Sequence, residues 1–191
     1  MPTPAADSIH DWLLPYVSAL DLRVISTIDL LVIHCTELPD LAVTREYGER
    51  VLYTSGTGNS GHYYIEGNGR VHRFVPNERI AHHVRGYNER AIGIELLNTG
   101  RWPNWLDSQH QAMTEAYPAV QIDSLIRLIQ QLRDELPSLR WIAGHEDLDR
   151  ERVPASDDPS ILVPRKRDPG PLFPWDQVMQ SVTLTRLGIQ A

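Results

Sequence analysis

The chain has 191 residues, of which 41% are hydrophobic and 23% are charged, and its formal net charge is −7. This length and composition suit one globular domain, residues 1–191, with a single substantial core. The acidic balance excludes the basic surface with which proteins bind nucleic acids, and it gives no general attraction to anionic lipids. We therefore expect no nucleic-acid partner and no membrane partner, and the sequence leaves the oligomeric state unknown.

The apolar pattern predicts strands that alternate with helices. Residues 28–35 (IDLLVIHC) form an apolar run that is typical of a strand buried on both faces. The elements expected after it are a helix at 41–53, a glycine-rich loop at 55–61, strands at 62–66 and 70–75 joined by Gly67-Asn68-Gly69, a strand at 91–98, a helix at 119–136 ended by Pro137, a strand at 139–143 and a helix at 174–182. This alternation predicts an α/β fold, a single mixed β-sheet flanked by helices, with its core at about 28–179.

The cysteine content and the N-terminal sequence indicate in which cellular compartment the protein is expected. Cys35 is the single cysteine and cannot form an internal disulfide, which fits a reducing compartment. Residues 1–7 carry neither the basic nor the apolar region of a secretory signal. The longest apolar run, at 30–33, is far too short to span a bilayer. We expect a cytoplasmic protein.

Three short stretches contain residue types that bind zinc. His34 ends the first strand, His145 follows the strand at 139–143, and Asp168 lies in an Arg-Lys-Arg-Asp-Pro-Gly segment. Two imidazoles and one carboxylate fill three positions of a tetrahedral zinc site and leave the fourth open, as catalytic zinc requires. Taken alone, His34 and His145 are also consistent with hydrogen-bonded histidines of the core, and Asp168 is consistent with a turn residue.

Alternation along extended segments sorts the neighbouring residues. Lys166 and Asp168 are two positions apart, so in an extended segment both side chains point the same way. This places an ammonium group beside the metal, where negative charge develops during acyl transfer. Arg165 and Arg167 then face outward. The same rule places Cys35 on the side opposite the adjacent histidine, in the core.

Three further residue positions each allow two interpretations. Glu95 is either a solvent-facing carboxylate on an edge strand or a buried acid of raised pKa, suited to acid–base chemistry or to anchoring a substrate amide. Of the adjacent His82 and His83, alternation lets at most one enter the cleft. Tyr63 is either a phenolic donor to an oxyanion or a tyrosine of the core.

Six motifs occur in order along roughly 28–179. They are VIHCT at 32–36, GHYYI at 61–65, HHVRG at 82–86, IGIEL at 92–96, GHED at 144–147 and RKRDPGP at 165–171. Each motif alone is weakly specific, whereas the ordered set is specific. The set resembles the type 2 N-acetylmuramoyl-L-alanine amidases, which are AmpD-like zinc amidases that share a fold with the peptidoglycan recognition proteins.

The resemblance implies a metal site, a reaction and a substrate. It implies Zn²⁺ held by His34, His145 and Asp168. It implies that Glu95 and Lys166 are catalytic and that the amide between N-acetylmuramic acid, or its anhydro form, and L-alanine of the stem peptide is hydrolysed. Peptidoglycan fragments (muropeptides) are therefore the expected partners. The residues expected to bind substrate are Tyr63, His83 and Arg85.

Two departures from the family pattern leave alternatives open. Residues 149–163 look like a turn-rich insertion, which forms either a rim of the substrate groove or an inert surface loop. His82 stands where the family often has tryptophan, and Trp102 and Trp105 are alternative stacking surfaces. Three functions remain: muropeptide recycling, lysis of intact wall by a phage or exported enzyme, and non-catalytic binding of peptidoglycan. The short chain without a wall-binding appendage favours recycling, and the complete residue set argues against a pure binder.

Overall fold

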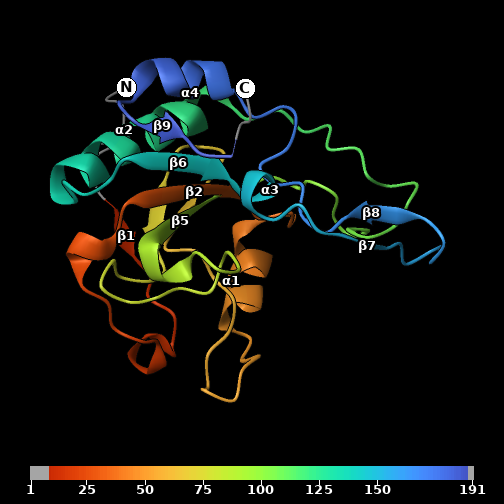
Figure 1. Ribbon diagram of the computed structural model, residues 1–191, viewed down its shortest axis with the longest axis horizontal. Helices are drawn as coiled ribbons and strands as arrows, with labels where there is room; N and C mark the ends of the chain where they lie inside the picture. The colour runs from red at the N-terminus through yellow and green to blue at the C-terminus, as the bar shows by residue number, and fades with distance from the viewer. Residues whose placement is uncertain (1–8, 189–191) are drawn as a thin grey trace.

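The computed structural model describes residues 9–188, which form a seven-stranded sheet with helices packed on it (Figure 1). The strand order is β1-β4-β3-β5-β2-β6-β9. The strands are β1 (His10–Asp11), β2 (Leu30–Cys35), β3 (Tyr63–Ile65), β4 (Val71–Arg73), β5 (Ala91–Leu96), β6 (Trp141–Gly144) and β9 (Thr185–Arg186). Neighbouring strands are parallel except for the antiparallel β3–β4 pair. The predicted mixed sheet is confirmed.

Helices cover the two faces of this sheet unequally. The α-helices are α1 (Leu41–Glu49), α2 (Ala119–Glu135), α3 (His145–Leu148) and α4 (Trp175–Ser181). The apolar stripe of α2 and Val178 of α4 pack against Leu31 and Ile33 of β2, and this is the largest buried cluster. The opposite face of β2 packs Leu30 and Val32 beneath irregular segments. That less covered face is where a cleft can form.

Helix α1 ends four residues earlier than the sequence pattern predicts. Its first turn is capped because the Asp40 carboxylate accepts a hydrogen bond from the backbone N–H of Val43 at 2.8 Å. Beyond the last turn, the backbone N–H groups of Leu52 and Tyr53 both donate to the Thr57 carbonyl, at 2.9 and 3.0 Å. Residues 50–59 therefore fold back as a loop beside the sheet instead of extending the helix.

Residues 149–163 form a hairpin, where the sequence predicts a loop. Strands β7 (Arg152–Pro154) and β8 (Leu162–Pro164) pair antiparallel as a separate sheet that projects from the body of the molecule (Figure 1). The hairpin is held to the long β5–α2 connection, because the Ser156 N–H donates to the Leu106 carbonyl at 2.9 Å. Ser108 also donates to the Asp157 carboxylate through its N–H and its hydroxyl, at 2.7 and 2.6 Å.

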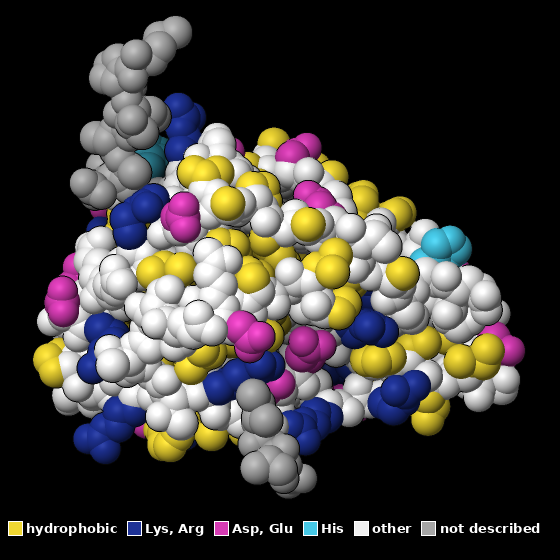
Figure 2. Space-filling view, turned by 90° about the horizontal axis from the view of Figure 1, so that it is seen from above, with side chains coloured by type: hydrophobic (Ala, Val, Ile, Leu, Met, Phe, Trp, Pro, Cys, Tyr) yellow, Lys and Arg dark blue, Asp and Glu magenta, His cyan; other side chains and the backbone are white. Residues whose placement is uncertain are grey.

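The surface of the described residues mixes both charges. On the face seen in Figure 2, basic and acidic side chains are interspersed with hydrophobic ones. Within residues 9–188, no helix is both long and apolar enough to cross a membrane. The residues on which the expected cytoplasmic location depends, 1–7, lie outside the described part of the chain.

Candidate active site

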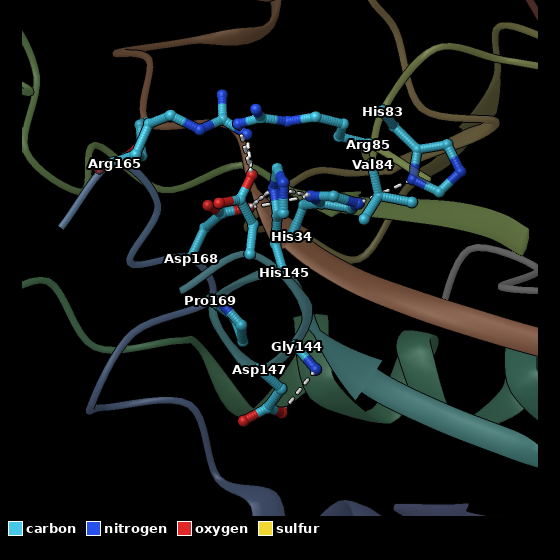
Figure 3. A network of polar contacts seen from close by, with 12 residues as sticks. His34, His83, Val84, Arg85, Gly144, His145, Asp147, Arg165, Asp168 and Pro169 are labelled. Atoms are coloured by element: carbon cyan, nitrogen blue, oxygen red, sulfur yellow. Dashed lines mark hydrogen bonds and ion pairs between the residues drawn. The ribbon is translucent and has the colours of Figure 1, made fainter. Parts of the chain in front are cut away.

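The three predicted metal ligands meet at the carboxyl ends of the central parallel strands. His34 ends β2, His145 begins α3 directly after β6, and Asp168 follows β8. The His34 and His145 Nδ1 atoms are 3.0 Å apart, and Asp168 Oδ2 lies 2.9 Å from the first and 3.0 Å from the second. All three residues are at most 3% exposed. Residues separated by as many as 134 positions therefore direct one atom each toward a common point, as Figure 3 shows.

This donor set fits a zinc ion. Imidazole nitrogen and carboxylate oxygen are zinc ligands, and a three-ligand site leaves a position free for water or substrate. The second carboxylate oxygen of Asp168, Oδ1, is buried and has no hydrogen-bond partner among residues 9–188. A buried carboxylate that lacks partners is costly unless a cation compensates its charge. The arrangement is thus that of a candidate metal centre.

The environment holds His34 and Asp168 in the protonation states that metal binding requires. Burial lowers the pKa of His34 to about 4, so its imidazole is neutral near pH 7. Burial alone would raise the pKa of Asp168, but electrostatic attraction to the His145 and His34 rings and the hydrogen bonds with them outweigh it and hold this pKa well below its usual range. Neutral imidazole and ionised carboxylate are the forms that bind metal.

Glu95 lies beside this centre on an interior strand. It is the register partner of His34 on β2 and of Tyr64 on β3, so these three side chains project from one face of the sheet. Because β5 lies between two other strands, the edge-strand interpretation is excluded. Burial, reinforced by the charge of Asp168, raises the pKa of Glu95 well above its usual value. Gly61 makes room for it, since a Cβ there would lie 2.8 Å from Glu95 Cγ.

Two basic residues, Lys166 and Arg165, also border the cleft. Lys166 borders it together with Asp168, as the two-residue spacing predicts. Arg165 also borders it and forms ion pairs with Asp149 and, at 3.3 Å, with Glu151. The expectation that Arg165 faces outward is therefore wrong. The segment folds back toward α3, where these two carboxylates draw the guanidinium inward.

Arg85, expected to bind substrate, is engaged by the same carboxylates. Its Nη2 donates to Glu151 at 2.5 Å and to Asp149 at 3.4 Å. Figure 3 shows the side chains of Arg85 and Arg165 directed toward each other above His34. Arg85 thus borders the cleft as part of an ion cluster of two arginines and two acids.

Tyr63 does not reach the cleft. It is 1% exposed, packs in the core beneath α2, and donates its hydroxyl proton to Asn77 Oδ1 at 2.9 Å. The expected contact of Tyr63 with substrate is therefore corrected to a core position. Tyr64 borders the cleft instead, and its hydroxyl accepts a hydrogen bond from the Gly61 N–H at 2.9 Å. The signal was present in the sequence, because Tyr63 shares its strand face with the apolar Ile65.

Both histidines of the His82-His83 pair border the cleft, whereas strand alternation allows at most one. They lie in an irregular loop, where alternation does not apply. The ring of His82 lies 5.1 Å from that of Tyr53. The ring of His83 contacts a candidate ligand, with its Nδ1 2.9 Å from Nε2 of His34. This contact places His83 on the side of the His34 ring that faces away from the metal centre.

A buried ion pair that sequence reasoning missed braces the site. The Arg101 guanidinium donates to both carboxylate oxygens of Glu37, at 2.6 and 2.8 Å, and the two residues are 3% and 6% exposed. Arg101 also donates to the carbonyls of Pro164 and Arg165, at 3.0 and 3.4 Å. It therefore ties the loop after β2 to the segment that carries Lys166. No local signal links positions so far apart.

The cleft extends from the metal centre along the loop after α1. Its volume is about 860 Å³. The wall beyond the metal centre is formed by Tyr47, Arg50, Tyr53, Trp105 and Leu106. Of the two expected stacking tryptophans, Trp105 borders the cleft and Trp102 packs behind it, with ring centroids 5.1 Å apart. A polar floor with aromatic walls suits a ligand that carries both sugar and amide groups.

Fold and site together define an α/β domain with a candidate metal centre at the carboxyl ends of parallel strands. Residues 25–171 match the family model of the N-acetylmuramoyl-L-alanine amidases (Amidase_2), so the chain belongs to this family. The predicted type 2 amidase family is thereby confirmed.

Similar proteins agree with this family. Over 136 residues the chain is 32% identical to N-acetylmuramoyl-L-alanine amidase AmiD of Escherichia coli K12, which covers 63% of the chain and 44% of AmiD. The chain thus spans less than half the length of this curated relative. A solved complex of AmiD from E. coli with the substrate anhydro-N-acetylmuramic acid-L-Ala-D-γ-Glu-L-Lys has a TM-score of 0.60 at 26% identity, covering 81% of this chain and 57% of that one.

Two more distant structures share the fold. Crystalline AmpD has a TM-score of 0.65 at 21% identity and covers 96% of this chain and 100% of its own. Drosophila PGRP-LB has a TM-score of 0.51 at 18% identity, covering 72% and 84%. The predicted fold, common to type 2 amidases and peptidoglycan recognition proteins, is confirmed.

Proposed function

We propose that the protein is a zinc-dependent N-acetylmuramoyl-L-alanine amidase, which hydrolyses the amide between N-acetylmuramic acid, or its anhydro form, and L-alanine of the stem peptide. The observation that carries this proposal is the convergence of His34, His145 and Asp168 in a cleft that also holds Glu95 and Lys166. A zinc ion there supplies Lewis acidity toward the amide carbonyl and lowers the pKa of water.

Glu95 and Lys166 have separate roles in this reaction, one in proton transfer and the other in charge stabilisation. Glu95 accepts a proton from the attacking water and returns it to the departing amine, and its raised pKa suits such transfers near neutral pH. Lys166 borders the cleft on the Asp168 side, where its ammonium donates to the oxyanion that develops on the lactyl carbonyl. These roles need a carboxylate and a cation in one cleft, and both Glu95 and Lys166 border it.

We further propose soluble muropeptides as the substrate and wall recycling in the cytoplasm as the setting. The support is the ligand in the AmiD complex, which is a short anhydromuropeptide. Trp105 brings an aromatic ring to the cleft wall for contact with the sugar, and beside it Arg50 stacks on the ring of Tyr47 and pairs with Glu46 at 2.7 Å. The cleft volume of about 860 Å³ suits such a fragment.

Product identification tests the proposed activity. Zinc-loaded protein is incubated with anhydro-N-acetylmuramyl tripeptide and, separately, with purified sacculi, and the products are analysed by mass spectrometry. We expect the free anhydro sugar and a tripeptide with L-alanine at its N-terminus, released faster than peptides are released from sacculi. His145→Ala is the inactive control. Cleavage within the peptide, or no cleavage by the zinc-loaded protein, would overturn the amidase proposal. Faster attack on sacculi would instead indicate a wall-lytic enzyme.

A further inference from the structure

We propose that His83 is a positioning residue, which accepts a hydrogen bond from His34 and thereby fixes the tautomer and the ring orientation in which His34 binds zinc. The inference rests on the proposed zinc site. The contact joins His34 Nε2 to His83 Nδ1 at 2.9 Å, on the side of the His34 ring opposite the metal centre. The two rings meet edge to face, with centroids 5.1 Å apart and an interplanar angle of 84°.

The proton assignment follows from the two contacts of His34. Its Nδ1 faces His145 and Asp168 and must present a lone pair to a metal. A neutral imidazole carries one N–H, so in the zinc-loaded protein the proton lies on Nε2. Among residues 9–188, the hydrogen-bond partner of Nε2 is Nδ1 of His83, which must then present its own lone pair. The tautomers of the two rings are therefore coupled, and the reverse assignment would turn an N–H toward the metal centre.

The position of the His83 ring is fixed from two sides. Beneath it lies Gly93 of β5, where a Cβ would come within 2.7 Å of the His83 Cγ and Nδ1 atoms. At the backbone, the N–H groups of His83 and Val84 both donate to the side-chain oxygen of Asn88, at 3.0 and 2.8 Å. The bare backbone of Gly93 thus admits the ring, and Asn88 holds the loop that carries it. These two constraints together hold the His83 ring against His34.

We expect His83 to affect zinc binding by orienting the imidazole of His34. Metal-bound histidines usually donate their second N–H to a carboxylate, a carbonyl or water, and loss of that partner costs about 10–100-fold in metal affinity or activity. A neutral imidazole orients His34 without adding a negative charge behind it. Replacing His83 should therefore weaken zinc binding even though His83 does not touch the metal position.

Zinc affinity, measured by competition with a chelator of known affinity, tests the inference independently of catalysis. His83→Leu removes the acceptor, and His83→Asn retains an oxygen acceptor near the position of Nδ1. Gly93→Ala retains the imidazole of His83 but displaces its ring from the present position. We expect His83→Leu and Gly93→Ala to bind zinc about 10–100-fold more weakly. We expect His83→Asn, and the neighbouring control His82→Asn, to stay close to wild type.

The tautomer is read directly by long-range ¹H–¹⁵N correlation spectra of the zinc-loaded protein. We expect the His34 proton on Nε2 in wild type. Wild-type zinc affinity in both His83→Leu and Gly93→Ala, or a His34 proton on Nδ1, would overturn the inference and leave the amidase proposal intact. Failure of the wild-type protein to bind zinc would overturn both. Should His83→Leu fail to fold, the comparison of Gly93→Ala with His83→Asn decides.

Discussion

His34 and Glu95 are register partners on the adjacent parallel strands β2 and β5, so a candidate metal ligand and a candidate acid–base group leave the sheet at the same level and on the same face. Both strands are interior, and hydrogen bonds on either side fix their backbones. The separation between the two side chains is therefore set by the spacing of neighbouring strands. A site built on strands holds its geometry better than one built on loops.

Replacing Glu95 with glutamine should abolish proton transfer and retain the metal. We expect Glu95→Gln to bind one zinc and to lower kcat by about 10²–10⁴-fold, the usual contribution of a general acid–base group. Because burial raises the pKa of Glu95, the basic form is lost as the pH falls through that raised value, so wild-type kcat/KM should rise with pH on its acidic limb. Steady-state kinetics across pH check both points. A glutamine variant with wild-type kcat would show that Glu95 only shapes the cleft.

Replacing Lys166 tests the stabilisation of the oxyanion. We expect Lys166→Ala to keep zinc and to lower kcat by about 10²–10³-fold, which is the usual loss for one oxyanion donor. Lys166→Arg, which retains the charge, should recover part of the rate. Rates and bound zinc are measured on the same samples. Normal kcat combined with weaker zinc binding would mean that Lys166 supports the metal instead of the transition state.

The Glu37–Arg101 pair should matter for stability. Arg101→Met leaves the Glu37 carboxylate buried and unpaired, which we expect to lower the free energy of unfolding by about 3–5 kcal/mol. The exposed Arg73–Asp11 pair is the matched control, and Arg73→Met should cost about 1 kcal/mol or less. Urea denaturation measures both variants. Equal losses would indicate that burial of the Glu37 pair has no energetic consequence.

We expect the β7–β8 hairpin to influence substrate choice because it supports one wall of the cleft. No residue of 152–163 lines the cleft, but Ser156 and Asp157 hold the segment that contributes Trp105 and Leu106. Replacing 155–161 with a short glycine bridge should loosen this wall and raise the rate on sacculi relative to soluble muropeptide. Asp158→Ala is the control, because within the described residues 9–188 Asp158 forms hydrogen bonds only inside the hairpin, with Ser160 and Ile161. An unchanged ratio with zinc still bound would favour an inert hairpin.

Local patterns in the sequence sufficed for strands β2 to β6, for helices α2 and α4 and for the grouping of His34, His145 and Asp168, because periodicity and ordered motifs carry that information, whereas the two-residue edge strands β1 and β9 are too short to show a pattern. The motif places Tyr63 in the cleft, whereas strand alternation, which puts Tyr63 on the same face as Ile65, places it in the core, where the structure has it. The His83 contact could not be predicted, since it depends on an irregular loop lying over Gly93. Long-range contacts between irregular segments leave no periodic signal.

The most direct test of zinc-dependent amide hydrolysis is a titration of metal-free protein with zinc, in which bound zinc and the rate of anhydromuropeptide cleavage are measured on the same samples. The three-ligand centre predicts that the rate rises in proportion to bound zinc and levels off at one equivalent per chain. The His145→Ala variant should stay folded and inactive throughout. A full rate in protein that holds far less than one equivalent of zinc, or no activity at one equivalent, would contradict the proposal.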